Sequence, residues 1–425
     1  MGTSYDQGCF ELCGCKAGRQ QPPTIRGRGT DPARASSRQR GSRIAGAHVR
    51  GRAWPMTMPL LTRVDASPAS PFDPRLESLR GLACLTVCVF HATHVFASNP
   101  QSVFFDTLLL AANPAAAVMF FFVLSGYVLG ASLERDLAIA PYLARRLFRL
   151  IPAFAAAVVF AFACERLLRL DPAPAGLTTG FQHLFWPQPT WHDLWDNLLL
   201  GSNRVNGPTW TLFPELLGSM MLPFVVAAHG RIEPRWRWAL FAAVTILLTS
   251  SPYRTLLWFY FGCFLVKEFA ALLAGRRQLA TVAFISGLVG LEIAGSYDEF
   301  YTVGIVLVSA TAAALMMGAV VSSRDMLRWT TTAPLRFLGR ISFSLYLVHW
   351  PIFYVCALVA VNCGSIVPTQ IWGNLFVMVT SLVAAIGIAA LAYRFIEAPS
   401  IRAGALAARL LAETWRSRAV VNSAG

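Results

Sequence analysis

Apolar runs of about 20 residues recur along this chain and constrain its fold more than any other feature. A helix of about 20 residues crosses the roughly 30 Å of hydrocarbon in a bilayer, and only helices and closed barrels satisfy the backbone there. The expected spans are 79–97, 114–133, 147–168, 209–229, 238–251, 255–274, 279–296, 301–321, 338–361 and 372–395. The fifth is short, so we predict about ten transmembrane helices in an all-α, polytopic integral membrane bundle.

Charge is scarce and unevenly placed. Only 14% of the residues are charged, about half the share of a soluble domain. Arginines concentrate in the loops after the second, fourth, sixth and eighth spans and after the tenth. Positively charged loops stay in the cytoplasm, so we predict both termini there and the 169–207 loop outside, with an interfacial helix at WHDLWDNLLL. The net charge of +14 implies membrane lipids as partners and requires no nucleic acid.

The first part of the chain is a different kind of sequence. Residues 1–74 are rich in Arg, Gly, Pro and Ser without apolar periodicity, which predicts disorder. A basic tail on anionic lipid is one interpretation; an over-extended start, with Met56 or Met58 as the true beginning, is the favoured one. The cysteines here lack a second cluster for zinc, so no metal site is predicted. A membrane domain over 75–400 and a cytoplasmic tail over 401–425 complete the organisation.

One span carries two ionisable residues at a telling spacing. Arg80 and His91 are eleven positions apart, so an α-helix places them on one face, roughly 16 Å apart along its axis. Arginine at the centre of a membrane helix costs about 2.5–3.5 kcal/mol on insertion scales. The pair indicates either a functional site lined with polar groups or polar contacts between helices, and the spacing alone leaves both open.

The segment RRLFRLIP places two arginines at the mouth of the third span. Arg146 and Arg149 are three residues apart, so they share a helix face. Guanidinium groups bind phosphate in bidentate fashion. An ordinary positive-inside flank explains a bare Arg-x-x-Arg equally simply, and taken alone it is the favoured interpretation.

Four further polar features lie within spans. Glu215 needs a partner or a function at its depth. Trp210 fits an interfacial aromatic belt, and Ser125 fits close helix packing. His349 lies well inside the ninth span beside Tyr346. A lone histidine in such a run is more often a packing residue than a catalyst.

Together these segments resemble one family. RLESLRGLACLTVCVFH, FFVLSGYVLG, RRLFRLIP, PTWTLFPE, ISFSLYLVHWPI and YRFIEAP are similar, in order and over about residues 75–400, to the motifs of membrane-bound acyltransferase family 3. The resemblance implies an O-acyltransferase, similar to bacterial O-antigen and exopolysaccharide O-acetyltransferases, in the bacterial inner membrane. It would move an acyl group, most often acetyl, from cytoplasmic acyl-CoA to a hydroxyl of an envelope glycan or glycoside. Acyl-CoA is then a co-substrate, and no bound cofactor is implied.

The resemblance also assigns roles to residues. Arg80 and His91 match the family's essential first-helix pair, Arg146 and Arg149 its cytoplasmic arginine pair, and Glu215 the acidic residue of its fourth-span motif. His91 and Glu215 are therefore the predicted catalytic residues. The three arginines are the predicted donor-binding residues. The supporting residues are Glu77, Ser125, Trp210, Tyr346 and His349.

Three positions depart from the family pattern: Thr211 stands for a usual serine, Phe343 for a common tyrosine, and Pro214 precedes the acidic residue. The hydroxyl survives at Thr211, while the phenol is absent at Phe343. These departures weaken the transfer of detailed roles to the ninth span more than they weaken the family resemblance.

The geometry agrees with this chemistry. The phosphates of an acyl-CoA would lie near the arginines, and its pantetheine arm would carry the thioester inward by about 16 Å. His91, with a reference pKa near 6.5, suits proton transfer from the acceptor, although an acyl-histidine intermediate stays open. Glu77, one turn before Arg80, either orients that arginine or forms a surface ion pair.

A secondary transporter is the rival from another class, since it also has about ten spans with polar groups at mid-membrane. Transporters usually show related halves with interrupted helices at matching positions. Residues 75–230 and 240–400 show no such similarity. The identities of the acceptor and of the acyl chain stay open at this stage.

Overall fold

The computed structural model describes residues 73–95, 113–168, 188–297, 301–362 and 371–423, and within these ranges every regular element is a helix. The predicted disordered segment lies outside them, apart from Asp73 and Pro74. The longer helices are α1 (Pro74–Thr93), α3 (Pro114–Arg135), α4 (Ile139–Leu167), α6 (Trp191–Leu198), α7 (Leu212–Arg231), α8 (Arg237–Thr249), α9 (Leu256–Leu273), α10 (Arg277–Gly295), α11 (Val303–Ser322), α12 (Ala333–Asn362), α13 (Ile371–Ala392) and α14 (Ala398–Ser423). Short turns η1 (Gly207–Thr211), η2 (Pro234–Trp236), η3 (Arg328–Thr331) and a π-helical turn η4 (Tyr393–Glu397) lie between them.

The predicted all-α membrane bundle is confirmed, with a lower count of clear spans. Each of the ten expected segments coincides with a helix, but in the described residues only eight helices are long and apolar enough to cross a membrane. Helix α8 has 13 residues and reaches only about 20 Å. Helix α1 carries Arg75, Glu77 and Arg80 in its first half, which lowers its hydropathy.

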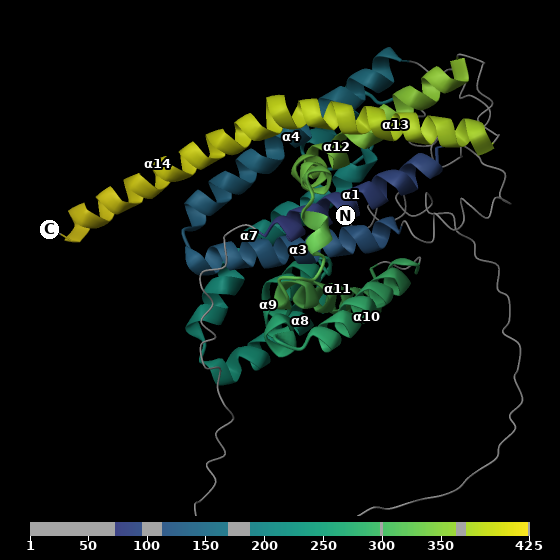
Figure 1. Cartoon of the computed structure of the whole chain (residues 1–425). Helices are drawn as coiled ribbons and strands as arrows, with labels where there is room; N and C mark the ends of the chain where they lie inside the picture. Colours follow the sequence, from purple (N-terminus) through teal and green to yellow (C-terminus); the bar gives the residue numbers. More distant parts are fainter. Residues whose placement is uncertain (1–72, 96–112, 169–187, 298–300, 363–370, 424–425) are drawn as a thin grey trace, which may run out of the picture. The chain divides into compact units, whose positions relative to one another are not determined.

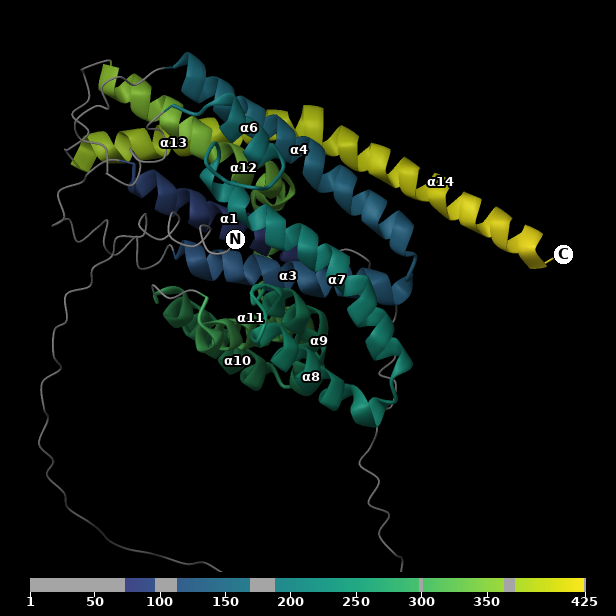
Figure 2. The same ribbon diagram turned by 180° about the vertical axis from the view of Figure 1, so that it is seen from behind.

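The core consists of two apolar clusters that meet at α1. The first joins α12 with α4, α13 and one face of α1. The second joins α3, α9 and α11, with residues of α1 again contributing. In both views of the chain α1 runs between α12 and α3 (Figures 1 and 2). Helix α14, which forms the predicted tail, packs along α4.

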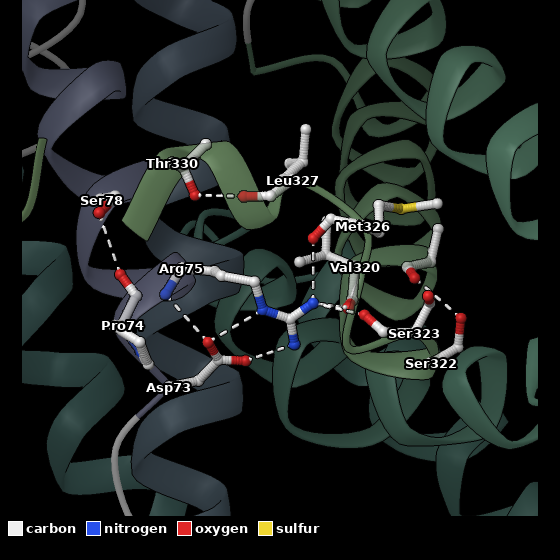
Figure 3. A network of polar contacts seen from close by, with 11 residues as sticks. Asp73, Pro74, Arg75, Ser78, Val320, Ser322, Ser323, Met326, Leu327 and Thr330 are labelled. Atoms are coloured by element: carbon white, nitrogen blue, oxygen red, sulfur yellow. Dashed lines mark hydrogen bonds and ion pairs between the residues drawn. The ribbon is translucent and has the colours of Figure 1, made fainter. Parts of the chain in front are cut away.

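A buried arginine fixes the start of α1. Arg75 donates from Nη1 to the carbonyl oxygens of Val320 at 3.0 Å and Met326 at 3.1 Å, and also to that of Ser323 (Figure 3). Its Nη2 pairs with Asp73 at 2.7 Å. The carbonyls at a helix C-terminus have no partner within the helix and attract cations. Arg75 therefore ties α1 to the end of α11.

The loop before α7 is buried against α12. Asn206, with no exposed surface, donates from Nδ2 to the Leu347 carbonyl at 2.9 Å. That carbonyl lacks its usual helical donor because Pro351, four residues on, has no N–H. The proline in the HWPI segment thus creates the acceptor that anchors the loop. The WHDLWDNLLL segment upstream forms α6, as predicted, with a capping box between Thr190 and Asp193.

Helix α7 consequently begins in the interior of the bundle. Glu215, in its first turn, accepts a hydrogen bond from Ser125, which lies at the middle of α3. Figure 2 shows the start of α7 alongside the central part of α3. Trp210, in η1, packs against the second apolar cluster.

Candidate functional site

The end of the α1–α12 contact nearer the N-terminus of α1, which we call its inner end, holds Arg80. Its Nη2 donates to the Gly339 carbonyl at 2.9 Å and its Nε to the Ser342 hydroxyl at 3.0 Å. The two helices approach closely here, since a Cβ on Gly81 would lie 2.5 Å from the Gly339 nitrogen. Two of the three Arg80 nitrogens are thus held by α12, while Nη1 donates no hydrogen bond among the described residues.

The end nearer the C-terminus of α1, which we call the outer end, holds two histidines. His91 Nδ1 lies 3.0 Å from His349 Nε2, and the ring planes differ by 8°. The ring of Trp350 meets His91 edge-on at 4.9 Å. His349 is fully buried, while His91 is partly exposed. Because Arg80 and His91 both contact α12, the predicted common face of α1 is confirmed.

The hydrogen bonds allow the protons of the pair to be assigned when both imidazoles are neutral. His349 Nδ1 is 3.2 Å from the Leu345 carbonyl, which only accepts. We therefore assign a proton to His349 Nδ1 and a lone pair to its Nε2, because a neutral imidazole carries one proton. The proton shared with His91 then belongs to His91 Nδ1. The remaining nitrogen, His91 Nε2, is left with a lone pair that can accept a proton.

Glu215 lies in a closed polar network. Arg146 donates from Nη2 to Glu215 Oε1 at 2.6 Å and from Nε to Ser219 Oγ at 3.1 Å. Ser125 donates to the same carboxylate oxygen at 3.2 Å. Ser219 in turn donates to the Glu215 carbonyl at 2.7 Å. In the described part of the chain no hydrogen bond or ion pair joins Glu215 to His91.

The second arginine of α4 faces a different carboxylate. Arg149 Nη2 lies 4.0 Å from Glu397 Oε1. Glu397 is the last residue of η4 and is fully buried. Its other oxygen accepts a hydrogen bond from Ser344 at 2.6 Å. Arg146 and Arg149, which the sequence places on one helix face, therefore contact different helices.

The remaining predicted residues have mixed placements. Glu77 forms no ion pair with Arg80 in the described structure, and its Oε2 is buried without a hydrogen-bond partner. The backbone carbonyl of Glu77 instead lies against Gly339. Tyr346 places its ring 5.8 Å from that of His349. Among the described residues, no three His, Cys, Asp or Glu side chains meet to hold a metal ion.

An apolar cavity of about 280 Å³ lies between α4, α12 and α13, with η4 at one side. Ser344, Leu347 and Val348 line it from α12. At 100° per residue, these positions are roughly 100–160° around the helix from His349. The cavity is therefore a separate feature from the histidine pair.

Sequence reasoning missed several residues of the site. Glu397 could have been found from the sequence, because a carboxylate at the end of the last predicted span requires a partner. Ser342 was only one of several hydroxyls along its span. Asn206 could have been found from Pro351, whose missing N–H requires another donor for a buried carbonyl.

These features define a class: a helical membrane protein with a hydrogen-bonded histidine pair and an arginine at opposite ends of one helix contact. The acyltransferase domain of acyltransferase family 3 matches residues 73–394, so the chain belongs to this family of membrane acyltransferases. No curated protein and no solved structure matches the chain significantly.

Proposed function

We propose that this protein is an O-acyltransferase that moves an acyl group, acetyl being the first candidate, from cytoplasmic acyl-CoA to a hydroxyl of an envelope glycan or glycoside. The observation that carries the proposal is the His91–His349 hydrogen bond on the same face of α1 as Arg80, in a chain of an acyltransferase family. It supplies a proton acceptor inside the bundle at a fixed distance from a cation.

The two ends of the contact would bind different parts of the donor. Arg80, with Nη1 uncommitted, would bind a phosphate of acyl-CoA by charge-assisted hydrogen bonds. The thioester, at the far end of the pantetheine arm, would reach the histidines roughly 16 Å away along α1. The arginine-rich loops predict that their side of the membrane faces the cytoplasm. An acyl donor from the cytoplasm is consistent with that prediction.

The histidine pair would act as a general base. His91 Nε2 takes the proton of the acceptor hydroxyl as its oxygen bonds to the thioester carbonyl carbon. The C–S bond then breaks, and the thiolate leaves and takes up that proton. The imidazolium formed in between keeps its Nδ1–H on His349 Nε2, a neutral acceptor that stabilises the charge. His349 is thus a positioning residue for His91.

Thioester turnover by the purified protein in detergent tests the proposal. With acetyl-CoA and a mixture of envelope glycans, we expect free thiol to appear together with ester-linked acetyl on the glycan. Accumulation of acetylated protein without acceptor would replace the general base with an acyl-histidine route. Absence of turnover, combined with uptake of a glycoside into proteoliposomes, would establish a transporter instead.

Membrane orientation is tested separately by labelling single cysteines. A cysteine at position 149 should react only from the cytoplasm and one at position 190 only from outside, because the arginine-rich loops stay inside. Reaction of both from the same side would contradict the topology. The same labelling in bacterial inner membranes tests the proposed location.

A further inference from the structure

The two arginine–glutamate pairs of α4 differ in how much of each guanidinium is used. Arg146 is bound by Glu215 and Ser219 at hydrogen-bond distance, and its side chain is 11% exposed. Arg149 lies 4.0 Å from its carboxylate, is 29% exposed, and donates no hydrogen bond within the described ranges. Only Arg149 therefore keeps its five N–H donors for another partner.

Glu397 is held from the side away from Arg149. Ser344 donates to its Oε2, and Oε1 has no hydrogen-bond partner among the described residues. A buried carboxylate with an unsatisfied oxygen is costly. The residue ends a π-helical turn, a local geometry that is rare and often occurs at functional sites. This combination identifies Glu397 as more than a packing residue.

We infer that Glu397 is a positioning residue that holds Arg149 for a phosphate of the acyl-CoA donor, whereas Arg146 is structural. This inference rests on the proposed function. At 4.0 Å the carboxylate attracts the guanidinium without consuming its N–H groups, so a bidentate contact with phosphate stays available. In the Arg146–Glu215 pair, Nη2 and Nε of the guanidinium are already engaged, which leaves fewer N–H groups for a phosphate than Arg149 has.

The Glu397→Gln variant tests the positioning role when its kinetics are measured with two acyl donors, acetyl-CoA and acetylpantetheine. The amide still accepts from Ser344 but removes the charge that faces Arg149. Binding must then order a free Arg149 side chain, so KM for acetyl-CoA should rise about two- to tenfold. KM for acetylpantetheine, which lacks the nucleotide phosphates, and kcat for both donors should not change. Ser344→Ala removes the hydrogen bond that holds the Glu397 carboxylate. It should raise KM for acetyl-CoA by less than Glu397→Gln does and leave KM for acetylpantetheine unchanged.

The control is Glu215→Gln in the other pair. It should lower the melting temperature and affect both donors equally, because Arg146 contacts no donor. In a double-mutant cycle, Arg149→Ala with Glu397→Gln should bind no worse than Arg149→Ala alone. An equal effect of Glu397→Gln on both donors, or additive losses in the cycle, would overturn the inference.

Binding of coenzyme A by calorimetry separates this inference from the proposed function. If the wild type binds coenzyme A but transfers no acetyl group, the proposed transfer is wrong, and the Arg149 and Glu397 variants still test the phosphate site. If Glu397→Gln binds coenzyme A like the wild type, the positioning role is wrong even when transfer is present.

Discussion

The inner and outer ends of the α1–α12 contact are built from opposite chemistry. At the inner end a permanent cation, Arg80, is held by a backbone carbonyl and a hydroxyl. At the outer end two imidazoles are joined by a hydrogen bond beside Trp350. The difference teaches that one helix pair can separate binding of a charged group from handling of a proton. A substitution at one end should therefore impair its own function, donor binding or proton transfer, without impairing the other.

The largest expected effect is at the outer end. His91→Ala should lower transfer by about 10²–10⁴-fold, the usual contribution of a positioned general base, and leave coenzyme A affinity unchanged. Calorimetry and transfer rates on the same preparation check this. His94→Ala is the matched control, because His94 Nδ1 binds its own helix at the Phe90 carbonyl. If His91→Ala loses donor affinity instead, the two ends are not separate.

The next effect is at the inner end. Arg80→Ala should weaken coenzyme A binding roughly ten- to a hundredfold, because charge-assisted hydrogen bonds contribute about 1.5–3 kcal/mol. The transfer rate at saturating donor should stay close to that of the wild type. A fall in that saturated rate, with affinity intact, would move Arg80 from binding to chemistry.

A smaller effect, on donor affinity and on transfer together, is expected from a substitution that separates α1 from α12. Gly81→Ala places a Cβ 2.5 Å from the Gly339 nitrogen, so α1 and α12 must move apart, at a cost of about 1–3 kcal/mol for overpacking. Donor affinity and transfer should fall along with the melting temperature. Gly387→Ala is the control, since nothing lies within 4 Å of a Cβ there. A Gly81 variant of normal stability would show that the contact is more adaptable than its geometry suggests.

The smallest expected effect concerns the start of the chain. A protein beginning at Met58 should insert and transfer like the full chain, because the removed residues lack the apolar periodicity of a membrane span. Expression level, membrane insertion and thioester turnover check this together. If the truncated protein lost coenzyme A binding or acyl transfer, the removed segment would have a role in that function.

The sequence was sufficient for the helices and for the shared face of Arg80 and His91, because both follow from local periodicity. It was insufficient for partners that lie far along the chain. His91 and His349 are 258 positions apart, and no local rule joins them. Arg146 and Arg149 looked equivalent because helix spacing says nothing about which neighbouring helix each side chain meets.

Long-range pairing has a consequence for how the protein is made. Helix α1 is not among the eight segments apolar enough to cross a membrane, and within the described residues the side chains of Arg80 and His91 form their hydrogen bonds with α12. At about 5–20 residues per second, the ribosome needs roughly 13–50 s to synthesise the intervening chain. During that interval the first helix carries uncompensated polar groups, so its stable insertion should depend on the insertion machinery or on helices made much later.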